Sequence, residues 1–73
     1  MAKLEAKAEV TGSVWKIITQ VGQQLEPGDT VMILESMKME IPVIAEDGGK
    51  LVELCVAEGT AITEGQVVAI LEG

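Results

Sequence analysis

The chain has 73 residues, enough for one small domain, and its 5 basic and 12 acidic residues give a formal net charge of −7. It contains no His and a single Cys, which excludes within this chain a Ser-His-Asp or Cys-His nucleophile, an internal disulfide and a zinc site. Its acidity and lack of Arg are unsuited to nucleic acid or to an anionic membrane surface. We therefore predict no metal site, and neither nucleic acid nor membrane as a partner.

The hydrophobic content of 48% is too high for a disordered chain, so we expect a folded core. No apolar run approaches the roughly 18 residues of a membrane-spanning helix, and the first residues lack the apolar region of a secretory signal. We expect a reduced cytoplasmic compartment, or an organelle matrix if a transit peptide had been removed.

The first segment, residues 2–8, is composed of good helix formers, yet we predict a strand there. A shift of 37 positions superposes the chain on itself and places residues 2–8 on the strand-like residues 39–45. Pro42 lacks an N–H group, so that strand should lie at a sheet edge or carry a bulge. The shift also aligns three pairs of glycines, Gly12 with Gly49, Gly22 with Gly59, and Gly28 with Gly65.

Further along the chain, apolar and β-branched runs bounded by glycine predict strands, about eight in all. The clearest are residues 14–18, 31–34, 51–56 and 67–71, although the pattern of an apolar run does not by itself exclude a buried helix. Turn signals occur at residues 26–29, 47–49 and 63–66. Trp15 is expected in the core or partly exposed on its strand, and Cys55, which aligns with Ile18, is expected to be a small buried apolar residue.

The repeat predicts one domain, residues 1–73, with pseudo-repeats at about 1–36 and 38–73 related by an approximate two-fold axis. Such an axis places residues 36–38 at the opposite end of the molecule from the termini, in a tight hairpin. Hairpin tips are normally built from Gly, Asn, Asp or Pro, but residues 35–40 read Glu-Ser-Met-Lys-Met-Glu. Either the methionines fold back onto the core, or the tip breaks the local rule because it is functional.

Met37-Lys38-Met39, preceded by Glu35 and Ser36, resembles the biotin-attachment motif of biotinyl carrier domains. Residues 25–31, 45–51 and 58–71 are similar to the segments that surround the motif in that family, so the resemblance covers essentially the whole chain. It implies an all-β fold, a flattened barrel or sandwich of two four-stranded antiparallel sheets called a barrel-sandwich hybrid.

The same resemblance implies a function. A biotin protein ligase would attach biotin to Lys38, with Met37 and Met39 as the flanking recognition motif. The non-catalytic, monomeric carrier would then move a carboxyl group between the biotin carboxylase and carboxyltransferase components of a biotin-dependent carboxylase or decarboxylase. Glu35, Ser36 and Glu40 would contact the ligase or other partners, although for the two glutamates solvated surface charge is an equal alternative.

The chain departs from the commonest family pattern at Ser36, where Ala is usual. Lipoyl domains usually have Asp before the lysine and Ala after it, and Met37 and Met39 match neither. A lipoyl or dual biotin/lipoyl attachment protein, with lipoate as cofactor, remains the alternative, followed by an unmodified interaction domain. The lack of an Ala/Pro-rich linker favours a free-standing carrier, although a domain cut from a longer chain would look the same.

Overall fold

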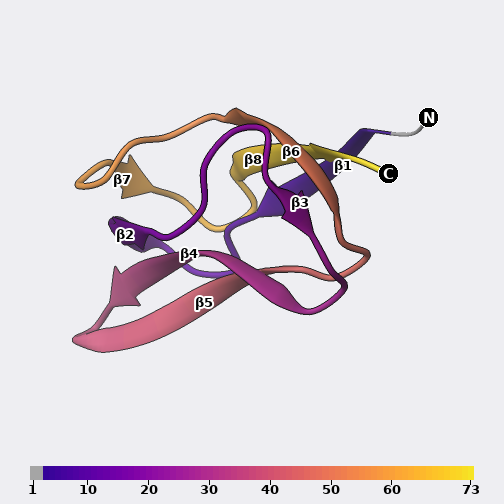
Figure 1. Cartoon of the computed structure of the whole chain (residues 1–73). Coiled ribbons are helices and arrows are strands. Elements are labelled where there is room, and N and C mark those ends of the chain that lie inside the picture. Colours follow the sequence, from indigo (N-terminus) through magenta and orange to yellow (C-terminus); the bar gives the residue numbers. More distant parts are fainter. Residues whose placement is uncertain (1–2) are drawn as a thin grey trace.

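The computed structural model describes residues 3–73, and this part of the chain contains strands and no helix (Figure 1). None of the described residues therefore forms a helix long and apolar enough to cross a membrane. The strands, in chain order, are β1 (Lys3–Lys7), β2 (Gly12–Ile17), β3 (Gln24–Leu25), β4 (Asp29–Ser36), β5 (Met39–Ala45), β6 (Gly49–Leu54), β7 (Ala61–Ile62) and β8 (Val67–Glu72).

The first segment is a strand, as predicted, although residue 2 lies outside the described residues. Its helix-forming residue types alternate in polarity, so that Leu4, Ala6 and Ala8 face inward while Lys3 and Glu5 face solvent. An alternation of period two matches a strand and not a helix. Pairing with β8 along the whole segment then outweighs the weak helix propensity.

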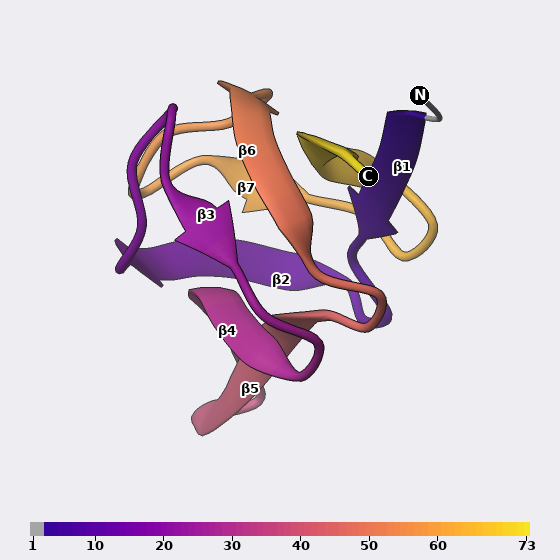
Figure 2. The same ribbon diagram turned by 45° about the vertical axis from the view of Figure 1, so that its right-hand side comes forward.

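Two four-stranded antiparallel sheets make up the fold, which confirms the predicted class (Figure 2). Sheet A has the order β1-β8-β6-β3, and sheet B has the order β5-β4-β2-β7. The shift of 37 residues converts one order into the other, so the internal two-fold symmetry is also confirmed. The first half of the chain supplies the two central strands of sheet B, β2 and β4, and the two outer strands of sheet A, β1 and β3. The second half supplies the two central strands of sheet A, β6 and β8, and the two outer strands of sheet B, β5 and β7.

Two of the three aligned glycine pairs occupy equivalent turns, whereas Gly12 and Gly49 begin the equivalent strands β2 and β6. Gly22 and Gly59 have φ of 97° and 88°, values that residues with a Cβ rarely adopt. Each donates its N–H across the symmetry axis at 2.7 Å, Gly22 to the carbonyl of Leu51 and Gly59 to that of Val14. Because these carbonyls are equivalent positions of opposite halves, the halves hold each other in place.

The core lies between the sheets and is aliphatic. Every one of its buried side chains is apolar. The two halves also share a β-bulge at equivalent positions, at Trp15 in β2 and at Val52 in β6. The largest fully buried side chains are Met32, Leu34, Leu51, Val14, Val31 and Val68.

Three other predictions can be compared with the structure. Pro42 lies on β5, an edge strand, as predicted. Trp15 is 48% exposed, so the alternative of a partly exposed position is right and a core position is wrong. The prediction for Cys55 is wrong, because its side chain is exposed. Cys55 follows the inward-facing Leu54 at the end of β6, and the next residue along an extended chain faces outward. Its aligned residue Ile18 is exposed as well.

Candidate functional site

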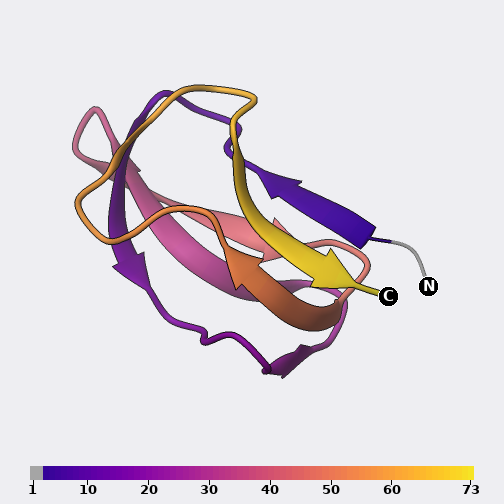
Figure 3. The same cartoon turned by 90° about the horizontal axis from the view of Figure 1, so that it is seen from above.

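The hairpin between β4 and β5 is the candidate site. Figures 1 and 3 show it at one end of the molecule, with the start of β1 and the end of β8 at the other, as the repeat predicts. The pairing runs from Asp29 opposite Ala45 to Ser36 opposite Met39. Met37 and Lys38 alone form the turn, so the tight hairpin is confirmed.

Both turn residues have a left-handed backbone, with φ of 52° at Met37 and 65° at Lys38. Two successive positive φ angles are the signature of a type I′ turn, which is normally built from Asn-Gly or Asp-Gly. Within residues 3–73 every other positive φ belongs to glycine. Placing an L residue in this region costs about 1–2 kcal/mol, so the hairpin keeps these two side chains at an energetic disadvantage.

The tip side chains project into solvent. Met37 is 92% exposed and Met39 is 61% exposed, so the alternative in which they fold back onto the core is wrong. Lys38 is exposed between them. The only ion pair among the described residues joins Lys7 to Glu5 at 4.0 Å, so the Lys38 amine is not held by a carboxylate. A primary amine is thus presented, flanked by two adaptable thioethers.

Contacts from other segments hold the base of the hairpin. The Ser36 hydroxyl donates a hydrogen bond to the carbonyl oxygen of Thr11 at 2.8 Å. The Thr11 hydroxyl in turn accepts from the backbone N–H of Glu64 at 3.1 Å. Gly12 packs so closely against the carbonyl of Glu35 that a Cβ on Gly12 would collide with it. The hairpin is therefore tied to the β1–β2 connection and through it to the turn before β8.

The charge at the hairpin differs from the charge at the opposite end of the molecule. Glu35 lies directly opposite Glu40 on β5 and Ser13 on β2. Its equivalent residue, Glu72, lies opposite two lysines, Lys3 and Lys50. Opposite charges across strands stabilise a sheet and like charges destabilise it. The hairpin end therefore keeps an uncompensated negative charge, whereas the equivalent carboxylate at the other end faces two lysines.

All six residues predicted for the site, residues 35–40, are brought together at this hairpin. Sequence reasoning missed Thr11 and Gly12, which support it. The alignment of Gly12 with Gly49 was an available signal, because glycines repeated at the same place in both halves can mark a close approach of backbone as well as a turn. Nothing in the sequence singles out Thr11.

Chemically, the site offers one exposed amine and no group beside it that would activate a substrate. Within residues 3–73 no cluster of three or more His, Cys, Asp or Glu side chains could hold a metal ion. What the arrangement can do is present Lys38 as an acceptor for an acyl group. A protruding two-residue turn lets another protein surround the amine from several sides, which a lysine within a sheet does not allow.

Comparison with known proteins supplies the context. Residues 5–71 match the family described as "Biotin-requiring enzyme". The biotin/lipoyl attachment protein of Bacillus subtilis (strain 168) is 43% identical over 60 residues, which are 82% of this chain and 82% of that protein. The biotinylated protein TB7.3 homolog of Mycobacterium leprae (strain TN) is 37% identical over 67 residues, covering 92% and 94% of the two chains.

Among solved structures, the urea carboxylase of Kluyveromyces lactis contains a region with the same fold. It superposes with a TM-score of 0.93 and 33% sequence identity, over 99% of this chain and 6% of that one. The chain is therefore similar to a small part of a large carboxylase, and similar over most of their length to small attachment and biotinylated proteins.

Proposed function

This chain belongs to the family of biotin-requiring enzymes and is a biotin carrier domain, and from that premise we propose that Lys38 is the residue that carries the biotin. The observation that carries the proposal is the hairpin turn. Two residues other than glycine adopt a left-handed backbone there, and one of them is an exposed lysine. This two-residue turn places the Lys38 amine at the tip of the β4–β5 hairpin.

The other lysines are less suited to the role, because all of them lie within strands. Lys7 is paired with Glu5, and Lys3 and Lys50 lie opposite Glu72. Lys16 lies in the middle of sheet B, on β2. A ligase active site that must enclose the amine meets neighbouring strands at each of these positions. Biotin has a carboxyl group, so an exposed primary amine fits it as the partner of an amide bond.

The attachment is a single acyl transfer. We propose that a biotin protein ligase supplies biotin as an acyl adenylate and that the Lys38 Nζ attacks its carboxyl carbon. The amide bond forms, the bond between that carbon and the adenylate oxygen breaks, AMP leaves, and the nitrogen gives up a proton to the ligase. Among the described residues no carboxylate is paired with the Lys38 amine, so we propose that the base comes from the ligase.

The neighbouring residues are assigned roles in recognition. Met37 and Met39 give the ligase two flexible apolar contacts beside the amine. Glu35 and Glu40 supply the uncompensated negative charge that steers a basic partner surface towards the tip. Ser36 holds the base of the hairpin through its hydrogen bond to Thr11, which keeps the direction of the tip constant.

Once attached, biotin supplies a ring nitrogen that accepts and releases a carboxyl group. We propose that this carrier serves a biotin-dependent carboxylase in a reduced cytoplasmic compartment, moving between the biotin carboxylase and carboxyltransferase components. The likeness to part of a urea carboxylase supports a carboxylase context. The chain itself positions the group and contributes no catalytic residue.

The test is co-expression with a biotin protein ligase and biotin, read by intact mass and streptavidin binding. Wild type is expected to gain the mass of one biotinyl group and to bind streptavidin. Lys38→Arg is expected to do neither, while Lys50→Arg, the matched control, behaves as wild type. A wild-type protein that stays unmodified under these conditions overturns the proposal, as does modification that persists in Lys38→Arg.

A lipoyl or dual attachment role is the second candidate, favoured by the name of the Bacillus subtilis relative. Parallel co-expression with a lipoyl ligase and lipoate separates the two roles, because the two acyl groups differ in mass. The gain of a lipoyl mass on Lys38 would support a dual role, and its absence together with biotinylation would leave biotin alone.

A further inference from the structure

The edges of β1 and β5 face each other along one side of the molecule. Both are outer strands of their sheets, and among residues 3–73 no backbone hydrogen bond joins them. The other two outer strands, β3 and β7, have only two residues each. The seam between β1 and β5 is therefore the place where long strand edges keep backbone groups that another strand could pair with, apart from the N–H that Pro42 lacks on β5.

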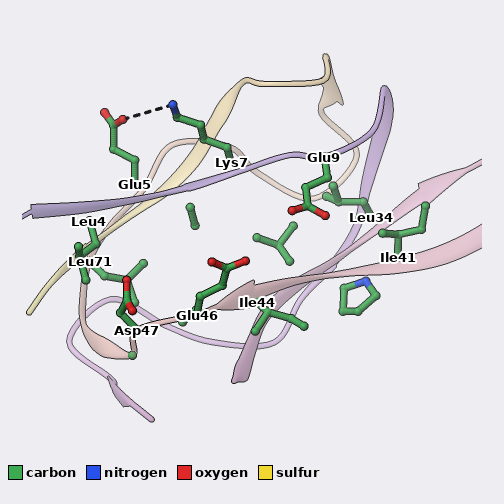
Figure 4. A pocket seen from close by; sticks show the side chains of 15 residues that line it. Leu4, Glu5, Lys7, Glu9, Leu34, Ile41, Ile44, Glu46, Asp47 and Leu71 are labelled. Atoms are coloured by element: carbon green, nitrogen blue, oxygen red, sulfur yellow. Dashed lines mark ion pairs between the residues drawn. The ribbon is translucent and has the colours of Figure 1, made fainter. Parts of the chain in front are cut away.

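A groove of about 390 Å³ lies along this seam (Figure 4). Part of its apolar lining is contributed in equivalent pairs by the two halves of the chain. Leu4 and Ile41 are one such pair and are half-buried, and Leu34 and Leu71 are another and are buried. The groove therefore follows the two-fold axis only in part, because β5 contributes more of the apolar lining than β1 does, and its long walls are the two strands themselves.

Carboxylates border the same groove. Glu9 and Glu46, again equivalent positions of the two halves, direct their side chains into the space between β1 and β5 (Figure 4). Asp47 lies beside Glu46 on the rim. The one lysine of the lining, Lys7, is already paired with Glu5. The groove thus joins an aliphatic lining to a negative rim.

We propose that this groove binds an extended segment of a partner protein that carries lysine or arginine residues. Three features select this occupant. Exposed strand edges pair with a polypeptide backbone, as in recognition by strand addition. Long basic side chains lay their aliphatic stems on apolar surface. Their charged ends then reach Glu9 and Glu46, where ionised partners make the stronger hydrogen bonds.

Docking in this groove is independent of Lys38. The groove follows β5 away from the hairpin, towards the turn at Glu46 and Asp47. A partner that holds the molecule here leaves the tip free. The site would therefore act as a tether, whether or not the lysine is modified.

The test uses the full chain, labelled with ¹⁵N, and a capped octapeptide that alternates lysine and valine. Amide shifts on titration locate the peptide, and the titration gives its affinity. The variant Glu9→Lys/Glu46→Lys removes the groove carboxylates. The control variant Glu53→Lys/Glu64→Lys makes the same change in formal charge at exposed positions outside the groove. A peptide alternating glutamate and valine is the second control.

The proposal expects the largest shifts at β1 and β5, an affinity that weakens with salt, and a loss of about tenfold or more in the groove variant, equivalent to about 1.4 kcal/mol. The control variant should lose less than about twofold, and the acidic peptide should not bind. Equal weakening in both variants, shifts centred elsewhere, or no binding overturns the proposal. A dimer of the free protein in sedimentation that the groove variant no longer forms also overturns it, since a second copy would then be the occupant.

Discussion

Glu35 and Glu40 lie directly opposite each other at the base of the hairpin, and their like charges face one another across β4 and β5. The equivalent residue of the second half, Glu72, lies between Lys3 and Lys50. The glutamate at this repeated position thus faces two lysines at one end of the molecule and another glutamate at the other end. Stability alone would favour a lysine at position 40, and the proposed steering of a basic partner surface would account for the glutamate there.

Glu40→Lys is therefore expected to stabilise the fold by about 0.5 kcal/mol at low salt, because it replaces a repulsive cross-strand pair with an attractive one. The gain should shrink as salt is added. Urea unfolding at several salt concentrations measures it. Glu53→Lys is the control, because Glu53 lies opposite Ile70 and the substitution removes no repulsion between paired carboxylates. Equal gains in both variants would assign the effect to net charge alone.

Met37→Asn is expected to raise the free energy of unfolding by up to about 1 kcal/mol. Asn tolerates the left-handed backbone of this position better than Met does, and the side chain of Met37, 92% exposed, has almost no packing to lose. Met39→Asn is the control, because Met39 lies in β5 outside the turn and Asn is disfavoured in strands. A destabilised Met37→Asn protein would contradict the idea that the turn is strained.

Gly12→Ala is expected to lower the free energy of unfolding by about 2–4 kcal/mol, within the range of changes that force a steric overlap. The added Cβ would collide with the carbonyl of Glu35. Gly22→Ala separates crowding from backbone conformation, since Gly22 has a positive φ but open space around it. That control should lose about 1–2 kcal/mol. A smaller loss at Gly12 than at Gly22 would show that the hairpin base moves aside.

Cys55 is expected to alkylate slowly despite its exposure. Partial desolvation of the sulfur raises its pKa, and the carboxylates of Glu53 and Glu5 raise it further. A raised pKa leaves less thiolate at a given pH, and thiolate is the reactive form. The rate of reaction with iodoacetamide should therefore rise at a more alkaline pH than for a free cysteine amide. Glu53→Gln should shift the profile back towards lower pH, and an unchanged profile would contradict the assigned cause.

Much of the fold could be predicted because it is repeated. Two of the aligned glycine pairs mark equivalent turns, and the third marks the starts of equivalent strands. The repeat also predicted a strand at residues 2–8, where helix propensity alone predicts a helix. The position of Lys38 at a hairpin tip followed from the same symmetry. The error at Cys55 has the same origin, since alignment with Ile18 transferred a residue type but said nothing of which way either side chain faces.

Other features depend on contacts between distant segments. The hydrogen bond between Ser36 and Thr11 joins residues 25 positions apart. No local pattern indicates that Glu72 lies opposite two lysines, because register between strands is decided by how both sheets pack on one core. The groove between β1 and β5 likewise exists only once the sheets have been assembled.

The exchange of outer strands has a consequence for how the chain folds. Neither half has a core of its own, since each sheet is completed by strands of the other half. A peptide of half this length could bury its apolar faces only by entwining with a second copy, as an obligate dimer. In the intact chain, Met37 and Lys38 are the covalent link between two such entwined copies. The hairpin is therefore both the tip that a partner would reach and the join that turns a bimolecular assembly into a single folding event.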